Sequence, residues 1–122
     1  MRKRAEFERI QRGGERVNTE RFVLILAAGE SASAPARLGI TASRKIGGAV
    51  QRNRAKRLVR AAFRATPELF ANGIDLVVIV RKPLGSLALA DVLTEWRAAK
   101  TALSRRIQGL LARAAEERNT PA

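Results

Sequence analysis

Arginine and lysine gather in one stretch of the sequence, and their chemistry is that of phosphate binding. Residues 37–64 contain nine basic residues and no acidic residue, and therefore carry +9 of the formal net charge of +13. Six of the nine lie between Arg52 and Arg64, at spacings that suit one helix. Neutralising phosphates with such groups releases the counterions that surround a nucleic acid. The pattern therefore predicts a surface for RNA or DNA.

A solvated charged face is the ordinary alternative. Solvation alone predicts mixed signs, because like charges four residues apart on a helix repel each other. No acid interrupts this block, so a polyanionic partner is the better interpretation. Asn53, between two arginines, adds an amide that suits a sugar or phosphate edge. Gly47 and Gly48 stand where the N-terminus of a helix would present free N–H groups to a phosphate.

Residues for self-contained catalysis are missing. The chain has no His, Cys or Tyr, which excludes acyl-transfer triads and zinc sites built on His or Cys. Paired carboxylates could still hold magnesium for a nuclease. The eleven acids are scattered, however, and none lies in the basic block. We therefore expect a protein that binds its partner and does not cleave by itself.

Length and composition predict one compact domain. The chain has 122 residues, of which 46% are hydrophobic, enough for a single core. The longest apolar run, residues 22–29, is too short to span a bilayer, and no signal peptide is visible. The lack of cysteine permits a reducing compartment. We expect a cytoplasmic protein with no membrane partner, with one domain over residues 1–118 and a frayed tail over 119–122.

Hydrophobic periodicity predicts the elements that carry the basic block. A short helix is expected over residues 4–11, and strands over 22–26 and 37–43 are expected to form an antiparallel pair. A helix over 49–65 turns an apolar stripe to the core, a central strand follows over 74–80, and Trp96 belongs to the core. The last helix is expected over 89–117, interrupted at Gly109. The order of helix, two or three strands, helix, strand and helix indicates a single-domain α+β sandwich with a small, mostly antiparallel sheet.

One segment resembles a known signature. Residues 37–60 read RLGITASRKIGGAVQRNRAKRLVR, which closely resembles the motif of the bacterial ribonuclease P protein subunit. The core of that motif is the triplet Arg52-Asn53-Arg54, followed by Lys56 and Arg57. Other landmarks agree along nearly the whole chain: Phe7, the strand at residues 22–24, and Asp75 before an apolar strand that ends in Arg81-Lys82-Pro83.

The resemblance implies a protein that assists a catalytic RNA. That RNA would remove the 5′ leader of precursor tRNA with magnesium bound mainly by the RNA, and the protein would supply no catalytic residue. DNA is not an expected partner. Contacts with the catalytic RNA are implied for Arg44, Lys45, Arg52, Asn53, Arg54, Lys56, Arg57 and Arg60. A cleft between the first helix and the sheet would bind the leader through Phe7, Phe22, Thr41, Ser43, Arg81 and Lys82. A left-handed β-α-β crossover, against the usual hand, is implied as well.

Two departures and two alternatives accompany this interpretation. Gln11 and Ile25 stand where family members often carry aromatic residues, so base stacking on the leader would be weaker here. A ribosomal or other structured-RNA-binding protein would share the charge, the size and the lack of catalytic groups. A helix-turn-helix DNA binder fits worst, because a strand and not a helix precedes the basic helix. Charge alone does not select the RNA that is bound.

Overall fold

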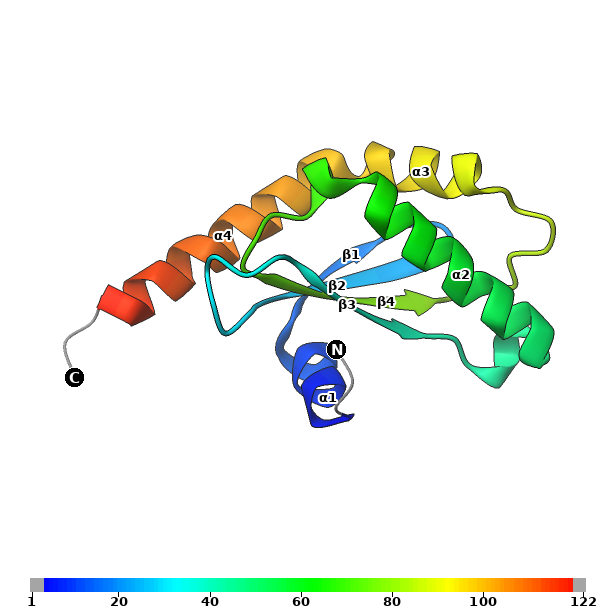
Figure 1. Ribbon diagram of the computed structural model, residues 1–122, viewed down its shortest axis with the longest axis horizontal. Helices are drawn as coiled ribbons and strands as arrows, with labels where there is room; N and C mark the ends of the chain where they lie inside the picture. The colour runs from blue at the N-terminus through cyan, green and yellow to red at the C-terminus, as the bar shows by residue number, and fades with distance from the viewer. Residues whose placement is uncertain (1–3, 120–122) are drawn as a thin grey trace.

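A four-stranded sheet with helices on both faces forms the described part of the chain. The computed structural model describes residues 4–119. In chain order the elements are α1 (Arg4–Gly13), β1 (Glu15–Asn18), β2 (Phe22–Ala28), β3 (Arg37–Thr41), the 3-10 helix η1 (Arg44–Ile46), α2 (Ala49–Ala65), the 3-10 helix η2 (Pro67–Leu69), β4 (Ile74–Val80), α3 (Leu89–Ala98) and α4 (Lys100–Asn119). Figure 1 shows α2, α3 and α4 on one face of the sheet and α1 on the other. The predicted α+β class is confirmed.

The strand order is β1-β2-β4-β3. β2 pairs antiparallel with β1 and with β4, whereas β3 pairs parallel with β4. The predicted pairing of residues 22–26 with residues 37–43 is therefore wrong. β4 lies between these strands because its seven residues are nearly all apolar and are best buried on both faces in the interior of the sheet. β3, α2 and β4 form a parallel β-α-β unit, and the left hand of its crossover stays a prediction.

Alternate residues of β2 and β4 enter two separate cores. The larger core lies beneath α2, α3 and α4 and receives Phe22, Leu24, Leu26, Leu76, Val78 and Val80. The smaller core lies beneath α1 and contains Ile25, Ala27 and Val77, with Val23 and Ile79 half-buried at its edge. Trp96 is fully buried in the larger core, with its ring centroid 5.9 Å from that of Phe22 and 5.8 Å from that of Phe70. The predicted core position of Trp96 is confirmed.

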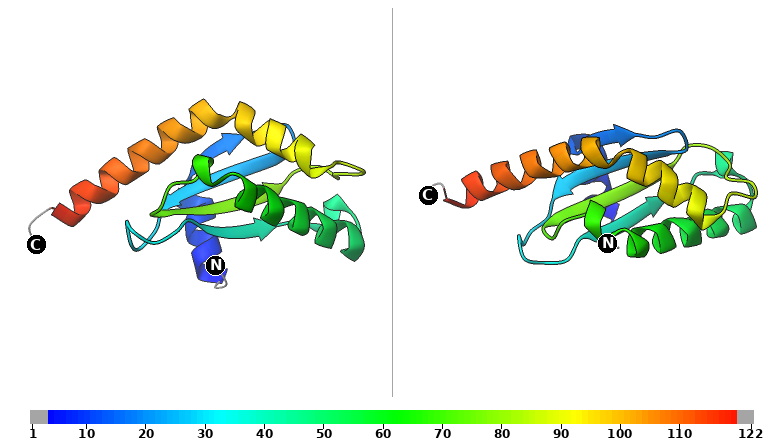
Figure 2. Two further views of the ribbon diagram at one scale, coloured as in Figure 1. Left: turned by 45° about the horizontal axis from the view of Figure 1, so that its top comes forward. Right: turned by 90° about the horizontal axis from the view of Figure 1, so that it is seen from above.

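The last helical segment is broken at a different place from the one expected. α3 ends at Ala98 and α4 begins at Lys100, so the break falls at Ala99, and α4 runs through Gly109 without interruption. The break lets α3 pack on α2 while α4 turns towards β1 and β2, as Figure 2 shows from two sides. A Cβ at Gly109 would meet no atom within 4 Å, so no packing requires a glycine there. Compared with alanine, it destabilises α4 by about 1 kcal/mol through its lower helix propensity.

Short elements account for the remaining differences. β1 is the optional third strand of the predicted order, and only Val17 is buried within it. Of the tail predicted over residues 119–122, residues 120–122 lie outside the described part. No helix between residues 4 and 119 is long and apolar enough to cross a membrane.

Candidate RNA-binding surfaces

The basic face of α2 points to solvent along the whole length of the helix. The core side is formed by Ala55, Val59 and Ala62, which are buried. The opposite side is exposed and consists of Val50, Asn53, Arg57, Arg60 and Arg64. These exposed positions are three or four residues apart, so they form one continuous stripe. We call them the α2 stripe.

The cations of η1 and α2 have no acidic partner within the described residues. Among residues 4–119, no ion pair joins a carboxylate to any of the eight cations Arg44, Lys45, Arg52, Arg54, Lys56, Arg57, Arg60 and Arg64. Elsewhere, Arg21 pairs with Glu95 at 2.8 Å and Arg97 pairs with Glu68 at 3.3 Å. The charge of η1 and α2 is thus not neutralised within the described protein.

Members of the Arg-Asn-Arg triplet have different surroundings. Asn53 is exposed on the α2 stripe, as are the predicted contacts Arg57 and Arg60 further along. Arg52 is half-buried, and its Nε is buried without a protein partner. Arg54 is half-buried and donates to the main-chain oxygens of Gly85 and Leu87. Sequence reasoning assigned the same role to all of these residues, whereas the structure gives Arg54 a partner inside the protein.

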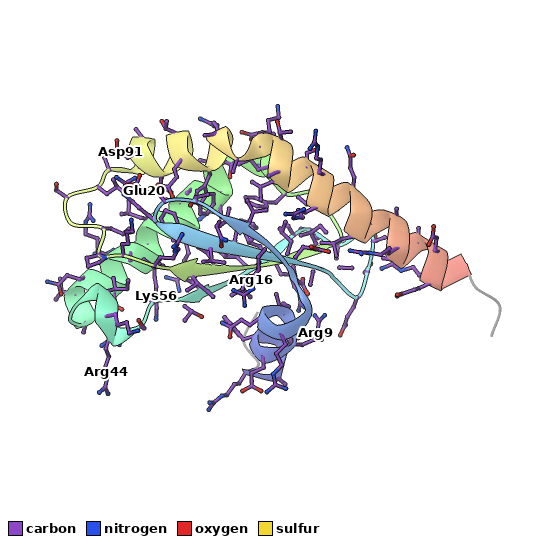
Figure 3. All side chains as sticks on the ribbon, turned by 180° about the vertical axis from the view of Figure 1, so that it is seen from behind. Arg9, Arg16, Glu20, Arg44, Lys56 and Asp91 are labelled. Carbon is purple, nitrogen blue, oxygen red and sulfur yellow. The ribbon has the colours of Figure 1, made fainter. Side chains whose placement is uncertain are left out.

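The N-terminus of α2 faces the same open side. Gly47 has a φ of +136°, a conformation that glycine adopts far more readily than other residues, and this turn joins η1 to α2. The N-cap residue Gly48 has no side chain to cap the helix, and the first turn of α2 has no acidic residue. The helix dipole there favours an anion. Arg44 and Lys45 are exposed just before this turn, and Figure 3 shows Arg44 pointing away from the body of the molecule, on the side of α1.

A second candidate surface is the row of residues that α1 leaves uncovered. The strand registers align Asn18 with Val23, Val23 with Ile79, and Ile79 with Thr41. This row therefore crosses all four strands, on the face that carries α1. α1 packs instead on the neighbouring row, where Ile25 is fully buried. Val23, Ile79 and Thr41 are only half-buried, so they form an open, largely apolar floor.

The wall beside this row comes from α1. A shallow cavity there is lined by Arg4, Phe7, Glu8, Gln11 and Thr41. The amide of Gln11 donates to the hydroxyl of Thr41, with an Nε2–Oγ1 distance of 3.4 Å. Phe7 is half-buried and packs towards the smaller core, so part of its ring stays open to a ligand. We call this cavity and the uncovered row the α1 cleft.

Five of the six residues predicted for the leader cleft are compatible with this geometry. Phe7 and Thr41 line the cleft. Ser43 follows β3, while Arg81 and Lys82 follow β4, and all three are exposed. Because β3 and β4 are parallel, these residues leave the sheet at the same end. Arg81 is further held by its bond to the main-chain oxygen of Thr19, at 2.9 Å.

Phe22 does not belong to the cleft, and its assignment is wrong. Its side chain is fully buried in the larger core, on the opposite face of the sheet, in contact with Trp96. Its neighbour Val23 occupies the cleft floor in its place. Sequence reasoning missed Val23, Ile79 and Asn18, because alternation relates residues within one strand, whereas the register between strands is needed to group these three.

Buried Asp75 fixes α1 to the sheet. Its carboxylate accepts two hydrogen bonds from Arg37, at 2.9 and 2.8 Å, and one from Arg9 of α1, at 3.4 Å. Arg37 also pairs with Glu6 of α1 at 3.5 Å. The hydrogen bond to Asp75 is the main cause that raises the pKa of Arg37. The sequence marked Asp75 only as a landmark, and its role in orienting α1 was not predicted.

Charged residues lie on both faces of the sheet. Figure 3 shows Arg9, Arg16 and Arg44 on the side of α1, whereas Glu20 and Asp91 lie on the side of α3. The cations of η1 and α2, which have no carboxylate partner within residues 4–119, together with the open α1 cleft on the other face of the sheet, define a protein that binds the backbone of a nucleic acid.

The chain belongs to the ribonuclease P protein family. The family model described as Ribonuclease P matches residues 1–104. The ribonuclease P protein component of Syntrophus aciditrophicus is 38% identical over 95 residues, which are 78% of each chain. That of Gluconacetobacter diazotrophicus is 44% identical over 82 residues, covering 66% of this chain and 70% of the relative.

Solved structures agree with this assignment. The RNase P protein of Thermotoga maritima superposes with a TM-score of 0.69 at 33% identity, covering 78% of this chain and 88% of that one. The RNase P protein of Staphylococcus aureus gives a TM-score of 0.65 at 29% identity, covering 84% of this chain and 86% of that one.

Proposed function

We propose that this chain is the protein subunit of a ribonuclease P holoenzyme, which removes the 5′ leader from precursor tRNA. In this role the α2 stripe and η1 bind the catalytic RNA, and the α1 cleft binds the single-stranded leader. The observation that carries the proposal is the set of eight cations on η1 and α2 that have no carboxylate partner within residues 4–119. Membership in the ribonuclease P protein family supports ribonuclease P RNA as that partner.

The α2 stripe suits a folded RNA because it is straight, exposed and positively charged. Arg57 and Arg60 lie one turn apart and are free to reach adjacent phosphates. Asn53 can donate to and accept from a ribose or phosphate edge. The N-terminus of α2, together with Arg44 and Lys45, adds a second group of phosphate contacts.

The α1 cleft suits a single strand because its floor is apolar and its ends are polar. Val23 and Ile79 offer van der Waals contact to unstacked bases, and Phe7 offers a ring on which one base can stack. Arg81 and Lys82 stand at the end of β4, where they can bind leader phosphates. Gln11 replaces an aromatic residue in this wall, so Phe7 supplies most of the stacking.

Magnesium in this enzyme is assigned to the RNA. The acids of the protein that are least accessible are engaged by arginine: the side chain of Asp75 is 2% exposed and that of Glu95 is 10% exposed, and each pairs with an arginine at 2.8 Å. The chain has no His, Cys or Tyr to move a proton or attack a phosphate. Its part in the reaction is to bind and orient RNA, and the cytoplasm is the compartment in which that role is needed.

Cleavage and RNA identity both test the proposal. Purified protein freed of RNA should leave precursor tRNA uncut in magnesium, and should stimulate cleavage once ribonuclease P RNA is added. Leader removal by RNA-free protein would contradict the proposal. RNA retained by the tagged protein in its own cells should be one large non-ribosomal species. Recovery of ribosomal RNA alone would instead support the alternative of a ribosomal protein.

A further inference from the structure

Arg54 lies across the loop that joins β4 to α3. Its Nη1 donates to the main-chain oxygen of Gly85 at 2.8 Å, and its Nη2 donates to the main-chain oxygen of Leu87. The guanidinium fork thus connects the middle of the basic helix to a loop more than 30 residues later. The planar guanidinium suits this arrangement, because its two Nη groups are held in a fixed fork and each can serve one carbonyl.

The loop over residues 81–88 has few other attachments. Leu84 is buried and Leu87 is half-buried, but Lys82, Pro83, Gly85 and Ser86 are exposed. Within the loop, the Leu87 amide donates to the Leu84 oxygen at 3.0 Å. The following amide, that of Ala88, donates to Asp91 at 2.9 Å. The two bonds from Arg54 are therefore a large share of what holds the middle of the loop.

The loop begins with the two cations assigned to the leader. Arg81 is fixed to the main-chain oxygen of Thr19, whereas the side chain of Lys82 forms no hydrogen bond or ion pair within residues 4–119 and is exposed at the start of the loop. Arg54 is half-buried, in contrast to the exposed Arg57 of the α2 stripe. Two of its five N–H donors are used by carbonyl oxygens of the protein, and a phosphate that took these two donors would release the loop.

We propose that Arg54 is a positioning residue, which holds loop 81–88 against α2 and thereby places Lys82 at the end of the α1 cleft. It acts on the leader through the loop and does not neutralise a phosphate of the catalytic RNA. The first half of this inference concerns the protein alone. The second half rests on the proposed function, because it needs a leader in the cleft.

Hydrogen–deuterium exchange of the full-length free protein tests the first half. Arg54→Lys keeps the charge but replaces the rigid fork, with its two separate Nη donors, by one ammonium on a shorter side chain, so exchange of residues 84–88 should rise about tenfold, the effect of weakening hydrogen bonds to a charged donor. Exchange in residues 22–28 should not change. Arg97→Lys is the matched control, since Arg97 donates to the Ala65 oxygen and to Glu68 away from the loop. Unchanged exchange of residues 84–88 in Arg54→Lys would overturn the inference.

Binding by the reconstituted holoenzyme tests the second half. Arg54→Lys should lower the ratio of affinities for precursor and mature tRNA by several-fold. For catalytic RNA, Arg54→Ala should leave the slope of log affinity against log salt unchanged, whereas Arg57→Ala should reduce that slope by about 0.7–0.9. A reduced salt slope in Arg54→Ala would mean that Arg54 contacts a phosphate directly, and would refute the positioning role. An unchanged ratio of precursor to mature tRNA affinity in Arg54→Lys would refute it too. A wild-type ratio near one would reject the leader-binding function itself, while the exchange result for the loop would stand independently.

Discussion

Removing two arginines of the α2 stripe should weaken RNA binding without harming the fold. Arg57 and Arg60 are exposed, and neither pairs with a carboxylate within residues 4–119. Neither packs in a core. Replacing both by Ala should therefore leave the melting temperature almost unchanged, because exposed substitutions of this kind usually alter stability by less than about 0.5 kcal/mol.

The size of the binding effect follows from counterion release. Each lost phosphate contact reduces the slope of log affinity against log salt by about 0.7–0.9, so the double variant should lose about 1.4–1.8. We take the two proteins to bind equally at about 1 M salt, where phosphate contacts contribute little. The reduced slope then corresponds to about 15–30-fold weaker binding of the double variant at about 0.15 M salt. The difference should shrink steadily as salt is added.

Equilibrium binding to the catalytic RNA at four or more salt concentrations measures this slope. A matched control is the double variant Arg106→Ala with Arg113→Ala, which removes the same charge from α4, where both arginines pair with Glu15 at 4.0 and 3.1 Å. Only the α2 double variant should show the full reduction of about 1.4–1.8 (about 0.7–0.9 per contact) in the salt slope. An unchanged slope would mean that the α2 stripe is merely solvated, and equal losses in both double variants would mean that charge acts without regard to position.

Three further predictions concern the α1 cleft and its anchor. Phe7→Ala should weaken holoenzyme binding of precursor tRNA by about 1–3 kcal/mol, the contribution of one stacked base, and should spare mature tRNA; an equal loss for both would make Phe7 a purely structural residue. Val23→Tyr should strengthen precursor binding because Val23 lies on the open floor, whereas Ile25→Tyr should lower the free energy of unfolding in urea by about 1–3 kcal/mol because Ile25 is fully buried. If Ile25→Tyr instead strengthened precursor binding and Val23→Tyr destabilised the fold, the assignment of Val23 to the cleft floor and of Ile25 to the core would be refuted. Asp75→Asn should cost about 2–4 kcal/mol in urea unfolding, against almost nothing for Glu8→Gln in its exposed pair.

The basic helix is the part of the fold that the sequence predicts most closely. α2 spans Ala49–Ala65, the predicted residues 49–65, because three signals agree there. The apolar period sets the buried side, the glycine pair precedes the helix, and Thr66-Pro67 ends it. The exposure of Asn53, Arg57 and Arg60 follows from the same angular spacing.

The faces of β2 could not be assigned from the sequence. Residues 22–26 are all apolar, as expected of a strand covered on both faces, so alternation does not tell which residues lie beneath α1. In the folded protein Ile25 packs in the smaller core with Ile10 of α1, which shows which face of β2 lies beneath α1. Phe22 was misassigned for this reason, and the aromatic residue expected at position 25 would have lain beneath α1 and not in the cleft.

Contacts between distant segments set the remaining limits of prediction. The partners of Arg54 are 31 and 33 residues away, so no local pattern distinguishes it from Arg57. The position of β4 between β2 and β3 likewise depends on the whole sheet. The break at Ala99 falls among good helix formers, so no local signal marks it.

The attachment of α1 gives the two RNA-binding surfaces different mechanical properties. α1 has one fully buried residue, Ile10, and is otherwise held by three longer polar contacts, Arg9–Asp75, Glu6–Arg37 and Gln11–Thr41, and by the partial burial of Phe7. Few contacts therefore oppose its separation from the sheet, and that separation should need much less free energy than global unfolding. The α2 stripe, by contrast, belongs to a helix seated on the main core. Leaders of different sequence can then be accommodated by small changes in the distance between α1 and the sheet, while the surface for the catalytic RNA keeps one fixed shape.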